Sequence, residues 1–102
     1  MHSSISVHEL KAALDQGEAT VIDVREPMEY AEGHLPGARL VPLAQVPTLV
    51  GNLPTDAPVY LVCAVGARSG RAAEYLAQNG VDAVNVEGGT RDWVAAGYPL
   101  DR

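Results

Sequence analysis

The sequence predicts a single α/β domain built on a mainly parallel sheet. Short apolar runs rich in β-branched residues alternate with helical patterns along the whole chain, which is typical of strand–helix–strand units. The chain has 102 residues, enough for one hydrophobic core and too few for two. In such sheets ligands bind beyond the carboxyl ends of the strands, so residues that follow a strand are the first candidates for function.

The first predicted element is a short amphipathic helix over residues 6–17. Ser6 is suited to the N-cap position, and Glu9 three residues later completes a capping box. The apolar residues that follow recur at helical spacing. Gly17 ends the pattern.

Four short runs predict strands. Most lack polar alternation, as expected of strands that are buried on both faces. Between and after them, helices are predicted by start signals such as Pro27 and by stop signals such as Gly33, Gly80 and Gly97. The predicted strands are residues 20–24, 38–41, 59–62 and 83–86, and the predicted helices are 27–31, 43–50, 69–79 and 90–96. We expect 43–50 to be helical in part, with Pro47 interrupting or restarting the helix.

Composition excludes several classes of protein. An apolar fraction of 47% argues against disorder, and no apolar run is long enough to span a membrane. The net charge of −6 makes nucleic acid an improbable partner. Residues 1–7 lack the features of a secretory signal, so we expect a cytoplasmic protein or a domain of a larger one. Three widely separated histidines show no metal-ligand spacing, so no metal site is predicted.

The residues that follow the third predicted strand suggest a reactive thiol. Cys63 is the only cysteine and lies where a strand turns into a helix, so unpaired N–H groups and the helix dipole favour its thiolate. Gly66 permits a tight loop, Arg68 adds positive charge, and Ser69 can cap the helix or donate to a bound anion. The remaining loop positions are compact and leave room for a ligand: Ala64, Val65 and Ala67. The alternative is that Cys63 is only a small core residue, but its neighbours favour the functional interpretation.

Three stretches resemble the rhodanese (thiosulfate sulfurtransferase) family in its single-domain form. Residues 21–38 (VIDVREPMEYAEGHLPGA) resemble its first signature, residues 63–69 (CAVGARS) its active-site loop, and residues 88–99 (GGTRDWVAAGYP) its closing signature. The likeness extends from Ile5 to Leu100, and three motifs in this order are highly specific.

The resemblance implies a rhodanese-like fold over residues 1–102, with a five-stranded, mainly parallel sheet flanked by helices. It also implies that Cys63 carries sulfur from thiosulfate or a persulfide to a thiol or cyanide acceptor, without a metal or organic cofactor. The expected partners are a small sulfur-containing anion, a thiol acceptor and, in a relay, another protein. Residues 64–69 are then expected to bind the substrate.

One loop position departs from the family pattern. Many relatives carry arginine directly after the cysteine, where this chain has Ala64, so a persulfide or a partner protein is an alternative donor to thiosulfate. The resemblance further implies that Asp23 bonds to the active-site loop and that Arg25 pairs with Glu29. We interpret Asp23 and Arg25 as supporting residues that brace the loop without reacting.

Other conspicuous residues receive structural interpretations. His34 lies between glycines and a proline and is expected to form bonds within a turn, and Trp93 is expected to pack in the core. The glutamates of 26–32 are interpreted as a solvated face. Arg71 either adds positive potential near the loop or pairs with Glu74 along the helix.

Two rival functions remain. A cysteine phosphatase or arsenate reductase uses the same physics, but its loop places five residues between cysteine and arginine, and here there are four. The other rival is a sulfur-relay or protein-binding module without autonomous turnover. The presence of Cys63 does not separate a relay from an independent catalyst.

Overall fold

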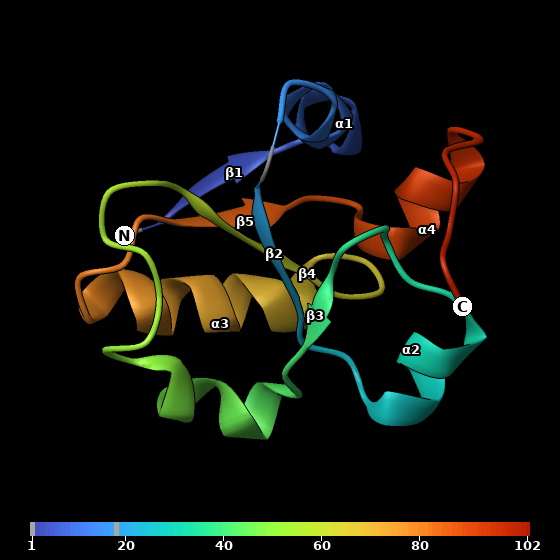
Figure 1. Ribbon diagram of the computed structural model, residues 1–102. Helices are drawn as coiled ribbons and strands as arrows, with labels where there is room; N and C mark the ends of the chain where they lie inside the picture. The colour runs from blue at the N-terminus through green and yellow to red at the C-terminus, as the bar shows by residue number, and fades with distance from the viewer. Residues whose placement is uncertain (1, 18) are drawn as a thin grey trace.

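The computed structural model describes residues 2–17 and 19–102, and within them five parallel strands form one sheet (Figure 1). The strand order is β1-β5-β4-β2-β3, so β4 is central. The pairs β1–β5, β5–β4, β4–β2 and β2–β3 are all parallel. The strands are β1 (Ser3–Ile5), β2 (Thr20–Asp23), β3 (Arg39–Leu40), β4 (Val59–Val62) and β5 (Ala83–Val86).

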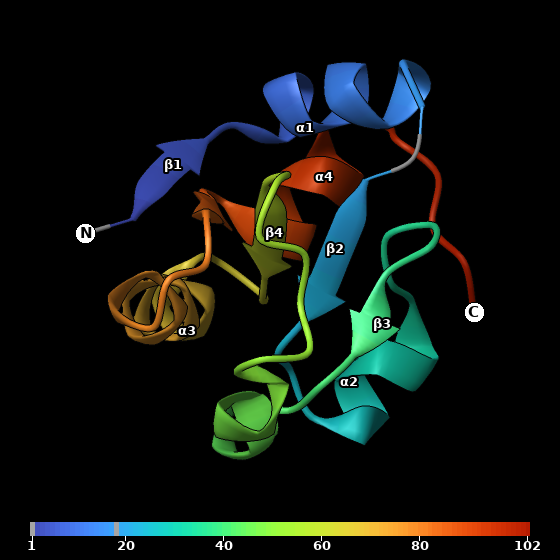
Figure 2. The same cartoon turned by 60° about the vertical axis from the view of Figure 1, so that its left-hand side comes forward.

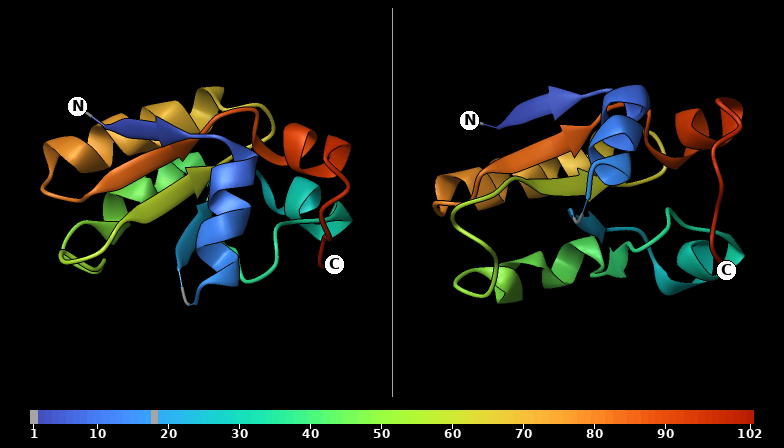
Figure 3. Two further views of the ribbon diagram at one scale, coloured as in Figure 1. Left: turned by 90° about the horizontal axis from the view of Figure 1, so that it is seen from above. Right: turned by 45° about the horizontal axis from the view of Figure 1, so that its top comes forward.

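Helices cover both faces of this sheet (Figures 2 and 3). The longest, α3, lies on one face together with a 3-10 helix, η1, whereas α1 and α4 lie on the other face. The helices are α1 (Val7–Asp15), α2 (Pro27–Glu32), η1 (Leu43–Leu49), α3 (Ala67–Gln78) and α4 (Gly89–Ala95). The predicted α/β class with a parallel sheet is therefore confirmed, as is the five-stranded count that the family resemblance implied.

Several local predictions are confirmed in detail. The Ser6 hydroxyl accepts the Glu9 N–H at 3.1 Å, and the Glu9 carboxylate accepts the Ser6 N–H at 2.9 Å, which completes the predicted capping box. Pro27 opens α2. The third and fourth predicted strands have the predicted bounds, 59–62 and 83–86.

Two elements differ from the residue-level prediction in more than the position of their ends. β1 was not predicted from its residues, because Ser3 and Ser4 are exposed and the segment is an edge strand of only three residues. Pro47 does not interrupt its segment but lies inside η1. In the tighter 3-10 geometry hydrogen bonds join residues three apart, so the missing N–H of Pro47 removes a single bond from a short helix.

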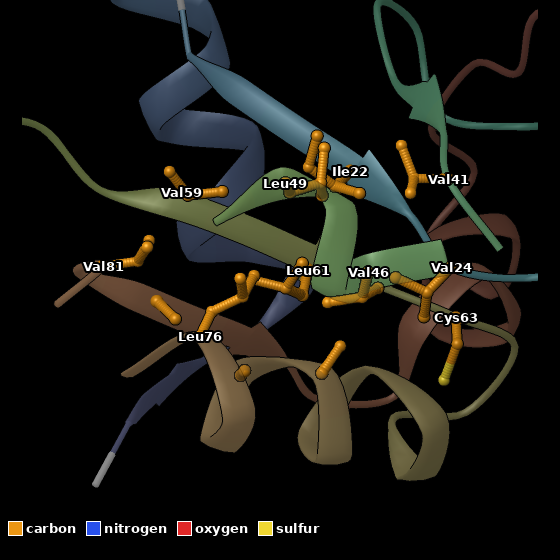
Figure 4. Close-up of a cluster of buried hydrophobic side chains, with 13 residues drawn as sticks. Ile22, Val24, Val41, Val46, Leu49, Val59, Leu61, Cys63, Leu76 and Val81 are labelled. Atoms are coloured by element: carbon orange, nitrogen blue, oxygen red, sulfur yellow. The ribbon is translucent and has the colours of Figure 1, made fainter. Parts of the chain in front are cut away.

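The core consists of two apolar clusters, one on each face of the sheet. Alternate residues of each central strand point to opposite faces, so Leu61 and Cys63 belong to the cluster under α3, whereas Val62 belongs to the cluster under α1 and α4. Trp93 is 1% exposed within the second cluster, which confirms its predicted core role. Figure 4 shows Cys63 at the end of the first cluster, beyond Val24.

The carboxyl edge of the sheet places the predicted site residues side by side. Asp23 ends β2 in register with Val62, the last residue of β4, and the Val24 N–H donates to the Val62 carbonyl at 2.9 Å. Asp23 therefore lies next to the point where the chain leaves β4 for Cys63. Among the helices of the described residues, none combines the length and the apolar character needed to cross a membrane.

Candidate active site

The site is centred on Cys63, which directly follows the central strand β4. Its side chain is 1% exposed, and Figure 4 shows the sulfur directed toward the first turn of α3. A thiol in this position faces the N-terminus of a twelve-residue helix, where backbone N–H groups are without helical partners. Any reactant must therefore reach the sulfur through the loop that surrounds it.

The Cys63 sulfur accepts hydrogen bonds from the loop. The Gly66 N–H lies 3.1 Å from Sγ, and the Ser69 hydroxyl lies 3.3 Å from it. Burial raises the pKa of the Cys63 thiol, but the Ser69 hydroxyl and the amides of Ser69, Gly66 and Val65 together outweigh it, so the pKa lies below its ordinary value. The arrangement favours the thiolate, which is the nucleophilic form of cysteine.

Backbone conformation at Gly66 makes this loop possible. Gly66 has a φ of 110°, in the left-handed region that other residues rarely adopt, and it is the N-cap of α3. The helix therefore begins at Ala67, two residues earlier than predicted, and its first turn includes Arg68 and Ser69. Ser69 is fully buried, whereas Val65 projects from the loop and is 47% exposed.

A second turn, at the start of α4, holds the loop from the other side. The Cys63 carbonyl accepts hydrogen bonds from the Thr90 N–H at 2.9 Å and from the Thr90 hydroxyl at 3.1 Å. The Ala64 carbonyl accepts the Arg91 N–H at 3.0 Å. A Cβ on Gly89 would lie 2.3 Å from the Cys63 carbonyl oxygen, so only glycine allows this approach.

Asn85 of β5 connects the loop to the sheet. Its Oδ1 lies 2.6 Å from the Ser69 hydroxyl oxygen, and its Nδ2 donates to the Gly66 carbonyl at 3.2 Å. The Ser69 hydroxyl has one hydrogen to donate, so Asn85 and the Cys63 sulfur share the same donor. Asn85 therefore influences both the shape of the loop and the donor that stabilises the thiolate.

The site thus consists of one buried thiol inside a tight strand-to-helix loop. Comparison with known families identifies the domain that carries it. A family profile described as a rhodanese-like domain matches residues 6–96. This chain belongs to the rhodanese family. The resemblance found in the three sequence motifs is thereby confirmed.

Known relatives of this rhodanese domain include proteins with and without a stated activity. The chain is 47% identical over 77 residues to the uncharacterized protein YqhL of Bacillus subtilis, an alignment that spans 74% of this chain but only 61% of YqhL. It is 36% identical over 87 residues to a protein of Allochromatium vinosum named sulfurtransferase, covering 84% of this chain and 81% of that protein.

Solved structures of related proteins show the same fold. The rhodanese-like domain protein of Staphylococcus aureus superposes with a TM-score of 0.84 at 41% identity, covering 89% of this chain and 90% of that one. The rhodanese-like fold that the resemblance implied is therefore confirmed.

The supporting residues of this rhodanese domain form a different ion pair from the one expected. Arg25 does not pair with Glu29. Its guanidinium donates to Asp23 through Nε, at 3.0 and 3.1 Å to the two carboxylate oxygens, and through Nη2, at 2.8 Å to Oδ2. Nη2 also donates to the Gly33 carbonyl at 2.8 Å. Asp23 and Arg25 are both buried and only two residues apart, so they neutralise each other's charge. The Glu29 carboxylate is therefore available to a different arginine.

Asp23 braces the site less directly than predicted. Its carboxylate accepts hydrogen bonds from the backbone N–H and the guanidinium of Arg25, and among the described residues it makes none to residues 63–69. The predicted bond to the active-site loop is therefore wrong. The Asp23–Arg25 pair instead ties the end of β2 to the turn after α2, through the Gly33 carbonyl.

Glu29 pairs with Arg68 of the active-site loop. The contact is bidentate, with Nη1 at 2.8 Å from Oε1 and Nη2 at 2.9 Å from Oε2. Glu29 is therefore more than part of a solvated acidic face. The sequence did not reveal this pair, because 39 residues separate the partners and only the fold brings α2 beside the start of α3.

His34 has the structural role that was predicted. Its Nδ1 lies 2.9 Å from the Tyr30 carbonyl, and its ring stacks on the Tyr30 ring with centroids 3.7 Å apart. Arg71 is exposed on α3. Two further residues of the site, Asn85 and Thr90, were not identified from the sequence. The available signal was Asn85 itself, a polar residue in a strand whose four positions are all buried.

Proposed function

We propose that this protein is a sulfurtransferase that moves a sulfane sulfur through a persulfide on Cys63. The observation that carries the proposal is the Gly66 N–H held 3.1 Å from the Cys63 sulfur, at a strand-to-helix turn. A sulfur that accepts amide hydrogen bonds is stabilised as an anion, both as the thiolate and as the outer sulfur of a persulfide. The membership of the chain in the rhodanese family supports the same reaction.

The reaction has two half-reactions. The Cys63 thiolate attacks the outer sulfur of the donor, a sulfur–sulfur bond forms, and the donor's own sulfur–sulfur bond breaks. With thiosulfate the leaving group is sulfite; with a persulfide it is a thiolate. A thiol or cyanide acceptor then attacks the outer sulfur of the persulfide, takes it as a new persulfide or as thiocyanate, and regenerates the Cys63 thiolate. This is covalent catalysis with ping-pong kinetics.

The loop suits a small reacting group. Cys63 is 1% exposed and only four residues separate it from Arg68, so the space beside the sulfur is narrow. A single sulfane sulfur is one atom wide, whereas a phosphoryl group places several oxygens around phosphorus. The backbone amides and the Ser69 hydroxyl bind the anionic sulfur. These features favour sulfur transfer over phosphate hydrolysis.

Intact-protein mass spectrometry tests the proposal. After incubation with thiosulfate or with a small-molecule persulfide, the protein should gain the mass of one sulfur atom, and cyanide should remove it. The Cys63→Ala variant should gain nothing. A gain in that variant, or the absence of a gain with every donor in the wild type, would contradict the proposal.

Steady-state kinetics separate a catalyst from a relay. If Cys63 loads sulfur but small thiols and cyanide remove it too slowly for turnover, the relay function replaces autonomous catalysis. Release of phosphate from an aryl phosphate, lost in Cys63→Ser, would instead support the phosphatase alternative.

A further inference from the structure

The ion pair between α2 and the active-site loop has a geometry that bears on donor choice. Arg68 and Glu29 make two hydrogen bonds of 2.8 and 2.9 Å, and their side chains are 34% and 35% exposed. The Glu29 carboxylate is itself oriented, because its Oε1 also accepts the Glu26 N–H at 2.9 Å. The fork of the guanidinium is therefore filled by a fixed carboxylate.

The carboxylate is charged over the whole physiological pH range. Hydrogen bonds from the Arg68 guanidinium, above all, and from the Glu26 N–H lower the pKa of Glu29 to about 2. The positive charge of Arg68 is consequently offset by a permanent negative charge in direct contact with it. An incoming anion must compete with that carboxylate for the same N–H groups.

Arg25, the buried arginine of the site, does not compensate. Arg25 is 6% exposed and is bound to Asp23 and to the Gly33 carbonyl. The position after Cys63, where a cation would lie closest along the chain, is the neutral Ala64. Beside the sulfur itself, the hydrogen-bond donors are backbone N–H groups and the Ser69 hydroxyl.

We propose that Glu29 is a specificity-determining residue that competes with the sulfur donor for Arg68 and thereby favours donors of low charge over dianionic thiosulfate. The preferred class is then a hydropersulfide, R–S–SH, or another donor with at most one negative charge. This inference rests on the proposed function, since it concerns the donor that loads Cys63.

The favoured half-reaction balances without a further reactant. The Cys63 thiolate attacks the outer sulfur of R–S–SH, the sulfur–sulfur bond of the donor breaks, and R–S⁻ leaves. The proton on the transferred sulfur passes to R–S⁻. The products are the Cys63 persulfide anion, held by the loop amides, and the thiol R–SH. The donor site meets no more than one negative charge at any stage.

The test compares two donors that differ in charge. Thiosulfate carries two negative charges, and benzenethiosulfonate carries one on the same kind of sulfane sulfur. The quantity measured is the ratio of kcat/KM for thiosulfate to kcat/KM for benzenethiosulfonate, with cyanide as the common acceptor. In Glu29→Gln the ratio should rise about fivefold, the effect of freeing a partly exposed charge.

Two matched variants make the result specific. Glu32→Gln removes the same charge from an exposed position of the same helix and should leave the ratio unchanged. The double variant Glu29→Gln/Arg68→Gln should lose the increase, because the freed guanidinium is absent. A ratio in Glu29→Gln that matches the wild type, or an equal rise in Glu32→Gln, would overturn the proposal.

Failure of the inference is distinguishable from failure of the proposed function. If neither donor adds sulfur to Cys63 of the wild type, the sulfurtransferase proposal itself is wrong. If both donors load Cys63 and the ratio does not respond to Glu29→Gln, only the inference is wrong. Because Glu29 is one-third exposed and glutamine can still accept the Glu26 N–H, the variant should unfold cooperatively. A variant that fails to fold would show that Glu29 is needed for folding and would overturn its assignment to selectivity.

Discussion

The carbonyl oxygen of Cys63 is bound twice by Thr90, through the backbone N–H at 2.9 Å and the hydroxyl at 3.1 Å. Cys63 is therefore held on both sides, since its sulfur accepts hydrogen bonds from the loop that follows it and its carbonyl oxygen accepts them from the first turn of α4. The two turns belong to sequence segments 27 residues apart. This contact requires Gly89 at the start of α4, because a side chain there would collide with the Cys63 carbonyl oxygen.

Replacing Gly89 by alanine should disrupt this contact. The new Cβ would meet the Cys63 carbonyl oxygen at 2.3 Å and the Ala64 carbonyl carbon at 2.8 Å, so the loop must move. We expect the collision to lower the free energy of unfolding by about 1 to 3 kcal/mol, in addition to the cost of placing alanine at a positive φ. Alkylation of Cys63 by iodoacetamide should also be slower.

Gly97→Ala is the control for backbone strain alone. Gly97 has a φ of 81°, but a Cβ there meets no atom within 4 Å. Its cost should be about 1 kcal/mol, without an effect on the thiol. Equal losses in the two variants would show that the close approach at Gly89 is unimportant.

Removing the Ser69 hydroxyl should raise the pKa of the Cys63 thiol. The hydroxyl lies 3.3 Å from the sulfur and is the largest of the contributions that lower this pKa, although burial opposes them. Loss of this hydrogen bond removes a contribution that stabilises the thiolate, so the pKa should rise. The pH dependence of Cys63 alkylation in Ser69→Ala measures it.

Ser4→Ala, a change at an exposed serine of β1, serves as the reference for this titration. At neutral pH the thiolate fraction, and with it the rate of sulfur loading, should fall in Ser69→Ala and recover as the pH is raised. An unchanged alkylation profile in Ser69→Ala would mean that the amides alone stabilise the thiolate.

Asp23→Ala should be strongly destabilising. Asp23 is fully buried and is bound by the Arg25 guanidinium, so its removal leaves a charge without its partner beneath the edge of the sheet. The expected loss in the free energy of unfolding is about 3 to 5 kcal/mol, measured by urea denaturation. Asp15→Ala breaks the exposed pair with Lys11 and should cost less than about 1 kcal/mol. Similar costs for the two changes would refute the structural role of the Asp23–Arg25 pair.

The Glu29–Arg68 pair should make stability depend on pH in acid. The pKa of Glu29 is about 2 in the folded protein against an ordinary 4.5. Because the folded-state pKa is lowered, the stabilisation is complete above about pH 4.5 and is lost as the pH falls toward 2. Solvent screening of a pair that is one-third exposed keeps this contribution below about 1 kcal/mol.

The difference in Tm between the wild type and Glu29→Gln reports this contribution. It should be largest near neutrality and should shrink as the pH is lowered below about 4.5. The same comparison with Glu32→Gln gives the background from an exposed glutamate. A difference that stays constant into acid would show that Glu29 is not held ionised by Arg68.

The elements that the sequence predicted best are those with strong local signals. Residues 59–62 and 83–86 are apolar or β-branched enough to be read as buried strands, and Ser6 with Glu9 marks a helix start by short-range chemistry. β1 escaped prediction because it is short, lies at the sheet edge and exposes two serines. β1 is stabilised by its pairing with β5, a contact distant in sequence that the residues of β1 do not reveal.

In the site, too, the features set by neighbouring residues were predicted better than the contacts between distant residues. Cys63, Gly66 and Ser69 lie within seven residues, and their order along the chain was enough to predict a thiol in a tight loop at a helix start. The supporting contacts were predicted less well, since the resemblance assigned Glu29 to Arg25 whereas it pairs with Arg68.

The fold class, the family and the position of the buried thiol could be predicted from the amino-acid order alone, because they depend on short-range order: strand, cysteine, glycine and helix in succession. The pairing of each carboxylate with its arginine, and the contacts by which Asn85 and Thr90 hold the loop, became visible only in the folded chain. Those contacts join residues 16 to 39 positions apart, and the physical reason is that parallel strands bring their carboxyl ends to one edge whatever lies between them in the chain.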